Sequence, residues 1–101
     1  MTREYEVGSK LSNAEIQILL HIARGCTNRE IGRRLHVAED TIKSAVRSAA
    51  ARLGATCRAQ AVANALLQGW LAITRPDPNG IRHIVAGTRE TRKSRSGAGL
   101  S

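Results

Sequence analysis

Two helix-start signals stand close together in this sequence and constrain its fold more than any other feature. Ser12 is followed three residues later by Glu15, and Thr27 is followed three residues later by Glu30. Each pair has the capping-box pattern, in which a hydroxyl and a carboxylate satisfy free backbone amides at the start of a helix. Gly25 lies between the pairs, where it can end a helix in the left-handed conformation. The sequence therefore predicts one helix ending near Gly25 and another beginning at Thr27.

A third helix is expected from about Glu39 to Leu53, after a turn at residues 36–38 that follows the second helix. Apolar residues recur on one side of it, which indicates a buried face, at Ile42, Val46, Ala49 and Leu53. The opposite side is expected to carry Asp40, Ser44, Arg47, Ser48 and Ala51. Gly54 can end this helix, because glycine tolerates positive φ.

A fourth helix is expected from roughly Cys57 to Gln68, capped by Thr56 and ended by Gly69. After Thr74 the composition changes. Residues 76–80 are rich in turn formers, and residues 81–85 suit a short strand or a docking peptide, but a lone strand has no partner here. We therefore expect a flexible arm at residues 1–10, a folded domain at 11–74, and a linker with a basic, disordered tail at 75–101. The predicted fold class is all-α.

The charge of the chain favours a polyanionic partner. Net charge is +8, and 16 Lys and Arg residues face 8 Asp and Glu residues. A basic excess of this size is typical of proteins that contact nucleic acid. Soluble or ribosomal-type basic proteins are the alternative.

The two cysteines, Cys26 and Cys57, do not have the spacing of a zinc site, and the histidines are scattered. We therefore expect no metal and no other cofactor. No nucleophile, base and carboxylate stand together, so an enzyme is the least favoured class. The sequence has neither a signal peptide nor an apolar run that could span a membrane, and we expect a cytoplasmic protein.

Many residues between 11 and 71 recur in the order and spacing of a known domain. They are Leu11, Ser12 and Glu15, then Gly25, Thr27-Asn28-Arg29-Glu30-Ile31, Leu35, Thr41-Ile42-Lys43, Val46, Leu53-Gly54, Arg58, Gln60-Ala61 and Gly69. This pattern resembles the LuxR/FixJ-type helix-turn-helix domain and is nearest in scale to its stand-alone GerE-like members. A sigma-factor region 4-like module is a structural cousin, but the block that begins at Leu53 fits the LuxR/FixJ type better.

The resemblance implies a four-helix bundle with a central helix-turn-helix and a transcription factor that binds inverted repeats in DNA. It implies that the third helix reads the major groove and that the fourth supplies the contact of a homodimer. Only ten residues precede Leu11, so we expect no upstream sensing domain of the family type. One departure is Ala38, where the family usually has a capping Ser.

By family position, base contact falls to three residues of the third helix, namely Lys43, Ser44 and Arg47. Lys and Arg can donate to guanine O6 and N7, and Arg47 has the better bidentate geometry. The alternative for each is a solvated polar residue.

Phosphate contact is expected from residues at helix starts and on the basic helix, namely Thr27, Asn28, Arg33, Arg34, Thr41 and Arg58. For Thr27, capping is an equal explanation, and Arg58 can contact the DNA backbone or brace helices. For the dimer interface we expect Val62, Leu66 and Trp70, with Trp70 also explained as a hydrophobic plug.

Three functions remain open on these residues. The first is a sequence-specific dimeric regulator that binds double-stranded DNA. The second is a protein-interaction module of the same fold, which binds another regulator or RNA polymerase. The third is a nonspecific DNA coat, which would bind without site preference.

Overall fold

The computed structural model describes residues 8–91 and contains four helices and one two-stranded sheet. The helices are α1 (Asn13–Ala23), α2 (Asn28–Leu35), α3 (Glu39–Leu53) and α4 (Arg58–Gln68). The strands are β1 (Leu71–Ile73) and β2 (Ile84–Ala86). The predicted arm at residues 1–7 and the end of the predicted tail, residues 92–101, lie outside the described residues.

Both predicted capping boxes are confirmed. The backbone N–H of Glu15 donates to the Ser12 hydroxyl over 3.2 Å, and the Ser12 N–H donates to the Glu15 carboxylate over 2.8 Å. The corresponding distances for Thr27 and Glu30 are 3.1 and 2.8 Å. These bonds satisfy amides that have no partner inside the helix, so α1 and α2 begin where the sequence predicts.

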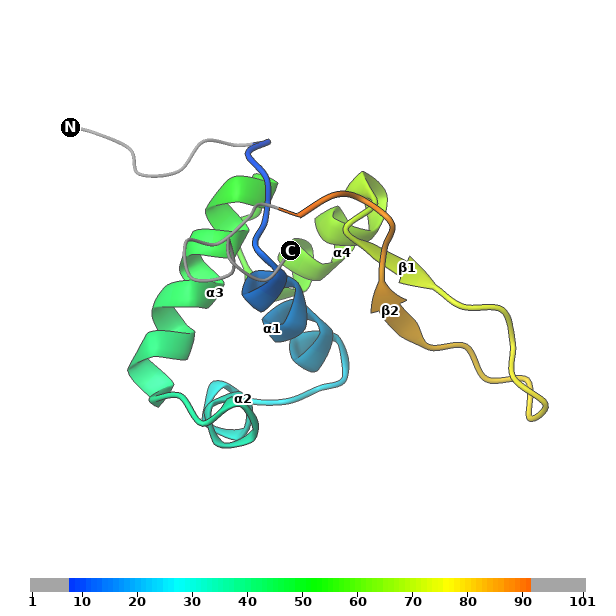
Figure 1. The fold of residues 1–101 in the computed structure, drawn as a ribbon, viewed down its shortest axis with the longest axis horizontal. Helices are drawn as coiled ribbons and strands as arrows, with labels where there is room; N and C mark the ends of the chain where they lie inside the picture. The colour runs from blue at the N-terminus through cyan, green and yellow to red at the C-terminus, as the bar shows by residue number, and fades with distance from the viewer. Residues whose placement is uncertain (1–7, 92–101) are drawn as a thin grey trace, which may run out of the picture.

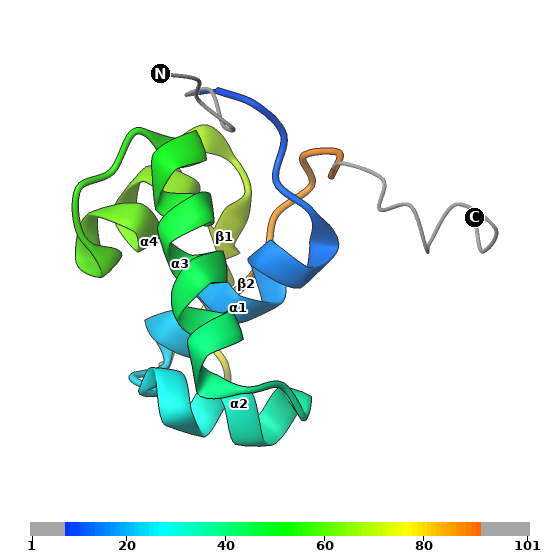
Figure 2. The ribbon, with the colours of Figure 1, turned by 90° about the vertical axis from the view of Figure 1, so that its left-hand side faces the viewer.

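Helix α1 is packed between α3 on one side and α4 with the sheet on the other (Figure 1). Leu11, Ile16 and Leu19 form the centre of the main core, which Leu53 and Trp70 join from α3 and from the end of α4. A view from the side of α3 shows this helix crossing in front of α1, with α2 beneath its first turns (Figure 2). Helix α3 therefore keeps one long side against the protein and the other side open.

A second apolar cluster fixes α2 against α1 and α3, through Ile18, Ile31 and Ile42. The turn that follows α2 closes tightly. Val37 N–H donates to the carbonyl of Gly32 over 2.8 Å, and a Cβ on Gly32 would lie 2.5 Å from the Val37 oxygen. His36 adopts the left-handed conformation, with φ of 60°. The angle between α2 and α3 therefore depends on a glycine that leaves room for the turn.

The expectation that residues 81–85 lack a strand partner is wrong. Strands β1 and β2 pair antiparallel, with Leu71 opposite Ala86 and Ile73 opposite Ile84. The fold is therefore mainly helical with an added β-hairpin, and the all-α prediction is incomplete. Structure also continues past residue 74, where the predicted domain ended, through the hairpin to residue 91.

The hairpin is held to the helices by its two ends. Gly87 N–H donates to the Trp70 carbonyl over 2.7 Å, and a Cβ on Gly87 would collide with the carbonyl of Gly69. The Arg89 guanidinium lies 4.4 Å from the Trp70 ring centroid and donates to the Gln68 carbonyl. Such stacking and hydrogen bonding order a ribbon that would be marginal alone.

Candidate nucleic-acid interface

The outer side of α3 carries three of the predicted DNA contacts together. Lys43, Ser44 and Arg47 are all exposed, whereas Ile42 and Leu53 on the same helix are buried. The residues are spaced by one, three and four positions, which places them on one side of a helix. The structure thus brings the predicted base-contact residues onto one exposed side of α3.

The start of α3 lacks a side-chain cap. Its N-cap is Ala38, whose side chain makes no cap hydrogen bond, and Glu39 and Asp40 occupy the first turn. Acidic residues near a helix N-terminus favour its dipole, and this offsets part of the missing cap. Thr41, one of the predicted phosphate contacts, is exposed next to this turn.

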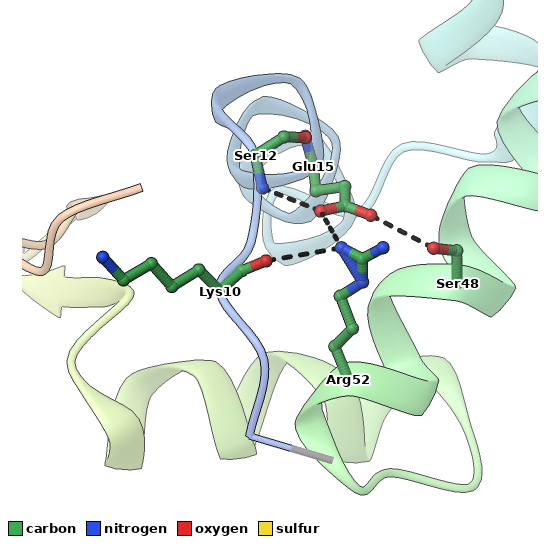
Figure 3. Close-up of polar contacts among 5 residues, drawn as sticks. All are labelled: Lys10, Ser12, Glu15, Ser48 and Arg52. Atoms are coloured by element: carbon green, nitrogen blue, oxygen red, sulfur yellow. Dashed lines mark hydrogen bonds and ion pairs between the residues drawn. The ribbon is translucent and has the colours of Figure 1, made fainter. Parts of the chain in front are cut away.

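A buried polar network holds the inner side of α3 (Figure 3). The Arg52 guanidinium lies 3.4 Å from the Glu15 carboxylate and donates to the Lys10 carbonyl over 3.3 Å. The Ser48 hydroxyl donates to the other carboxylate oxygen of Glu15 over 3.2 Å. The prediction that Ser48 lies on the outer side of α3 is wrong, because this residue is buried. For Glu15, only the capping role was expected from the sequence. This network ties α3 to the start of α1.

A hollow of about 390 Å³ lies beside α3. Its cationic lining comes from Lys43 and Arg47 of α3 and from Arg58 at the start of α4, while Asn28 contributes from the start of α2. Four predicted contact residues from three helices therefore border one concavity. Such a surface suits an extended anion with many oxygen acceptors.

Arg58 braces two helices, which was one of the two roles open to it from the sequence. Its guanidinium donates to the Asn28 side-chain oxygen over 2.8 Å and to the Cys26 carbonyl over 3.1 Å. Asn28 is half-buried as a result of this packing. The predicted cap at Thr56 is wrong, because Cys57 is the N-cap of α4 and Thr56 bonds to Gln60 instead.

The predicted phosphate contacts of α2 are on its open side. Thr27, Arg33 and Arg34 are exposed. The hydrogen bond from the Thr27 backbone N–H lowers the pKa of the Glu30 carboxyl, with further lowering from the Thr27 hydroxyl and the nearby Arg34 and Arg33. The cap of α2 is therefore charged at neutral pH, and its Thr27 hydroxyl is already engaged.

His21 of α1 is partly buried, and its Nδ1 has no hydrogen-bond partner among the described residues. Burial lowers its pKa, and the charges of Arg24 and Arg34 lower it further. It is neutral at neutral pH, so it adds no positive charge to the surface. No group of three His, Cys, Asp or Glu side chains within residues 8–91 is arranged to hold a metal ion.

The predicted dimer residues are not equally accessible. Val62 and Leu66 are half-buried and pack against the main core, and Trp70 is only 2% exposed. Trp70 is thus a plug of the core rather than a surface residue. Leu67, which is 84% exposed on α4, was not expected as a surface residue. The signal in the sequence was a second large apolar residue directly after Leu66.

These features define a helix-turn-helix domain in which α2 supports an exposed α3. The sequence model of the bacterial regulatory proteins of the LuxR family matches residues 9–65, and the chain belongs to this family. It therefore carries the DNA-binding domain of a transcription regulator. No helix among residues 8–91 is long and apolar enough to cross a membrane.

Solved structures that are similar to the chain include the following two. One is the response regulator ChrA of a heme-sensing two-component system, with 32% identity and a TM-score of 0.58, and the match covers 59% of this chain and 30% of ChrA. The other is the transcription factor GerE, with 25% identity and a TM-score of 0.57, covering 59% of this chain and 90% of GerE. No sequence among the curated proteins matches the chain.

Proposed function

We propose that the protein is a sequence-specific transcription regulator that binds an inverted repeat in double-stranded DNA as a homodimer, with α3 in the major groove. The observation that carries this proposal is the exposure of Lys43, Ser44 and Arg47 on the open side of a helix whose other side is locked to the core. A helix presented in this way fits the width of the major groove.

The chemistry of the three residues suits base recognition. Arg47 can donate two parallel hydrogen bonds to guanine O6 and N7, and Lys43 can donate to the same atoms as a point charge. Ser44 is short and lies between them in the sequence, so it suits a base edge or a phosphate close to the helix. We assign sequence readout to Arg47 first.

Phosphate contacts would fix the protein on the duplex. We assign these to residues of the first turn of α3, of α2 with its N-cap, and of the start of α4, namely Thr41, Thr27, Asn28, Arg33, Arg34 and Arg58. Arg58 already holds Asn28. Its remaining N–H groups can donate to a phosphate while it keeps the start of α2 in place.

Replacing Arg47 tests the readout. Arg47→Ala should cost about 1–3 kcal/mol at one base position and relax discrimination there. Arg75→Ala, which removes the same charge from the hairpin, is the matched control and should leave discrimination unchanged. The measurement is competition binding with duplexes that vary one base pair at a time. Unchanged discrimination in Arg47→Ala would remove Arg47 from base readout, and absence of DNA binding by the unchanged protein would favour the protein-interaction alternative.

We place the dimer contact on the exposed side of α4, around Leu67 and the exposed Ala59 and Ala63, four residues apart. The exposed parts of Val62 and Leu66 would border it. Leu67→Glu should convert the dimer to a monomer in sedimentation experiments, because a charge cannot be buried there without a partner. Ile81→Glu, a change at a similarly apolar exposed residue of the hairpin, is the control. A Leu67→Glu protein that stays dimeric would contradict this interface.

A further inference from the structure

The hairpin carries positive charge that its own acidic residues do not neutralise. The Asp77 carboxylate accepts hydrogen bonds from the Asn79 and Ile81 amides and pairs with His83, 3.2 Å away. Glu90 pairs with Lys10. Arg75 and Arg82 are both exposed, and neither has an ion-pair or hydrogen-bond partner within residues 8–91. Their guanidinium groups are available to an external anion.

The two arginines lie opposite each other in the hairpin, just beyond the paired strands. The Thr74 N–H donates to the His83 carbonyl, and further along the Asp77 N–H donates to the Ile81 carbonyl. Arg75 and Arg82 lie between these two hydrogen bonds, one on each arm. Like charges opposite each other on neighbouring strands are unfavourable unless an anion lies close to both. This arrangement points to a negatively charged ligand.

Apolar residues accompany these charges. Among the five exposed large hydrophobic residues within residues 8–91, three belong to the hairpin, namely Ile73, Ile81 and Val85, which are 55%, 53% and 37% exposed. A phosphate backbone offers no apolar groups to cover them. A polypeptide with both acidic and apolar side chains does, so the combination favours a protein ligand over a nucleic acid.

The hairpin also has an open edge. Hydrogen bonds at Trp70–Gly87 and Thr74–His83 mean that Ala72 and Val85 are the bonded pair between them, because bonded and non-bonded pairs alternate in an antiparallel ladder. The backbone groups of Leu71 and Ile73 therefore point away from β2. β2 packs on α1 and β1 packs on α4, but within residues 8–91 no backbone hydrogen bond joins Leu71 or Ile73 to a residue outside the sheet. The outer edge of β1 can therefore accept a further strand.

We propose that the outer edge of β1 binds an extended acidic segment of a partner protein, in which acidic and apolar residues alternate. The segment would add a third strand, with its carboxylates on the face of Ile73 reaching Arg75 and Arg82 and its apolar side chains on the opposite face covering Val85. The hairpin lies across the molecule from α3 (Figures 1 and 2), so DNA and this segment can bind together. The hairpin is also outside the residues that match the family, 9–65.

The test uses the full chain and a labelled peptide of alternating glutamate and valine, with an alternating lysine and valine peptide as its charge-reversed counterpart. Only the acidic peptide should bind. The chemical-shift changes that it causes in the backbone amides of the protein should centre on Leu71–Ile73. R75E/R82E should weaken binding about tenfold or more, since both attractive contacts become repulsive. R75K/R82K keeps the charge and should retain most of the affinity.

A second pair of variants separates this surface from the DNA surface. Arg47→Ala should bind the acidic peptide like the unchanged protein, and R75E/R82E should keep its DNA site preference. The proposal is overturned if R75E/R82E binds the acidic peptide unchanged, because the net charge of the chain would then explain the affinity. It is also overturned if the peptide does not bind, or if R75E/R82E loses DNA site preference as Arg47→Ala is expected to do.

Discussion

The helical part of the molecule, α1 to α4, and the hairpin that follows it reach order by different routes. Helices α1 and α2 begin at capping boxes, such as Ser12–Glu15, and all four helices bury an apolar side. The hairpin has short strands, and its order depends on contacts between residues far apart in sequence, such as Trp70 with Gly87 and Arg89. The helical structure therefore depends mainly on local sequence, whereas the structure of the hairpin depends on tertiary contacts.

Glu15 combines a local role in capping α1 with a tertiary contact to α3. It is an N-capping residue, and it also holds an almost buried ion pair with Arg52. Glu15→Ala should destabilise the protein by about 3–5 kcal/mol, because it removes a carboxylate that pairs with a nearly buried guanidinium. Denaturant unfolding followed by circular dichroism measures this loss.

Glu30→Ala is the matched control, since Glu30 has the same capping role on α2 but is exposed. Its loss of stability should be much smaller. Equal losses for the two variants would mean that capping alone accounts for Glu15, and that the α1–α3 network contributes little to stability.

Two glycines, Gly32 in the helix-turn-helix and Gly87 at the end of the hairpin, allow the stability of the two regions to be tested separately. Gly32→Ala places a Cβ 2.5 Å from the Val37 carbonyl in the helix-turn-helix, and should destabilise the whole helical part by about 1–3 kcal/mol. Gly87→Ala places a Cβ against the Gly69 carbonyl, and should release the hairpin while the helices remain. Helical circular dichroism and Trp70 fluorescence distinguish these outcomes. Loss of helical signal in Gly87→Ala would show that the hairpin and helices are one cooperative unit.

Acidification should loosen the hairpin tip by a small amount. The Ile81 amide, followed by His83 and the Asn79 amide, lowers the pKa of the Asp77 carboxyl below its ordinary value. The stabilisation is therefore complete above that ordinary value and is lost as the pH falls through the lowered one. Hydrogen exchange of the Asn79 and Ile81 amides should rise over this range, beyond the trend of Asp77→Asn. Identical pH profiles in the two proteins would contradict the role of the carboxylate.

The features that could be predicted from the sequence are those that depend on interactions between residues close together in the chain. Capping boxes and apolar periodicity gave the four helices, and the family pattern gave the exposed Lys43, Ser44 and Arg47. The partner of β2 could not be read from residues 81–85 alone, because strand pairing depends on the Trp70–Gly87 contact. The burial of Ser48 also required knowing which helices meet, since this residue has no local signal for it. For Trp70, the hydrophobic plug was one of the roles expected from the sequence.

The most direct test of the DNA-binding account is selection from a randomised duplex library near physiological salt, followed by sequencing. Affinity for DNA without sequence preference is mainly electrostatic, so the salt concentration must be fixed. A dimer that reads bases through α3 predicts enrichment of an inverted repeat with constant half-site spacing, and loss of one base preference in Arg47→Ala. Binding without any enriched sequence, or no binding, would contradict the proposal that this chain is a sequence-specific regulator.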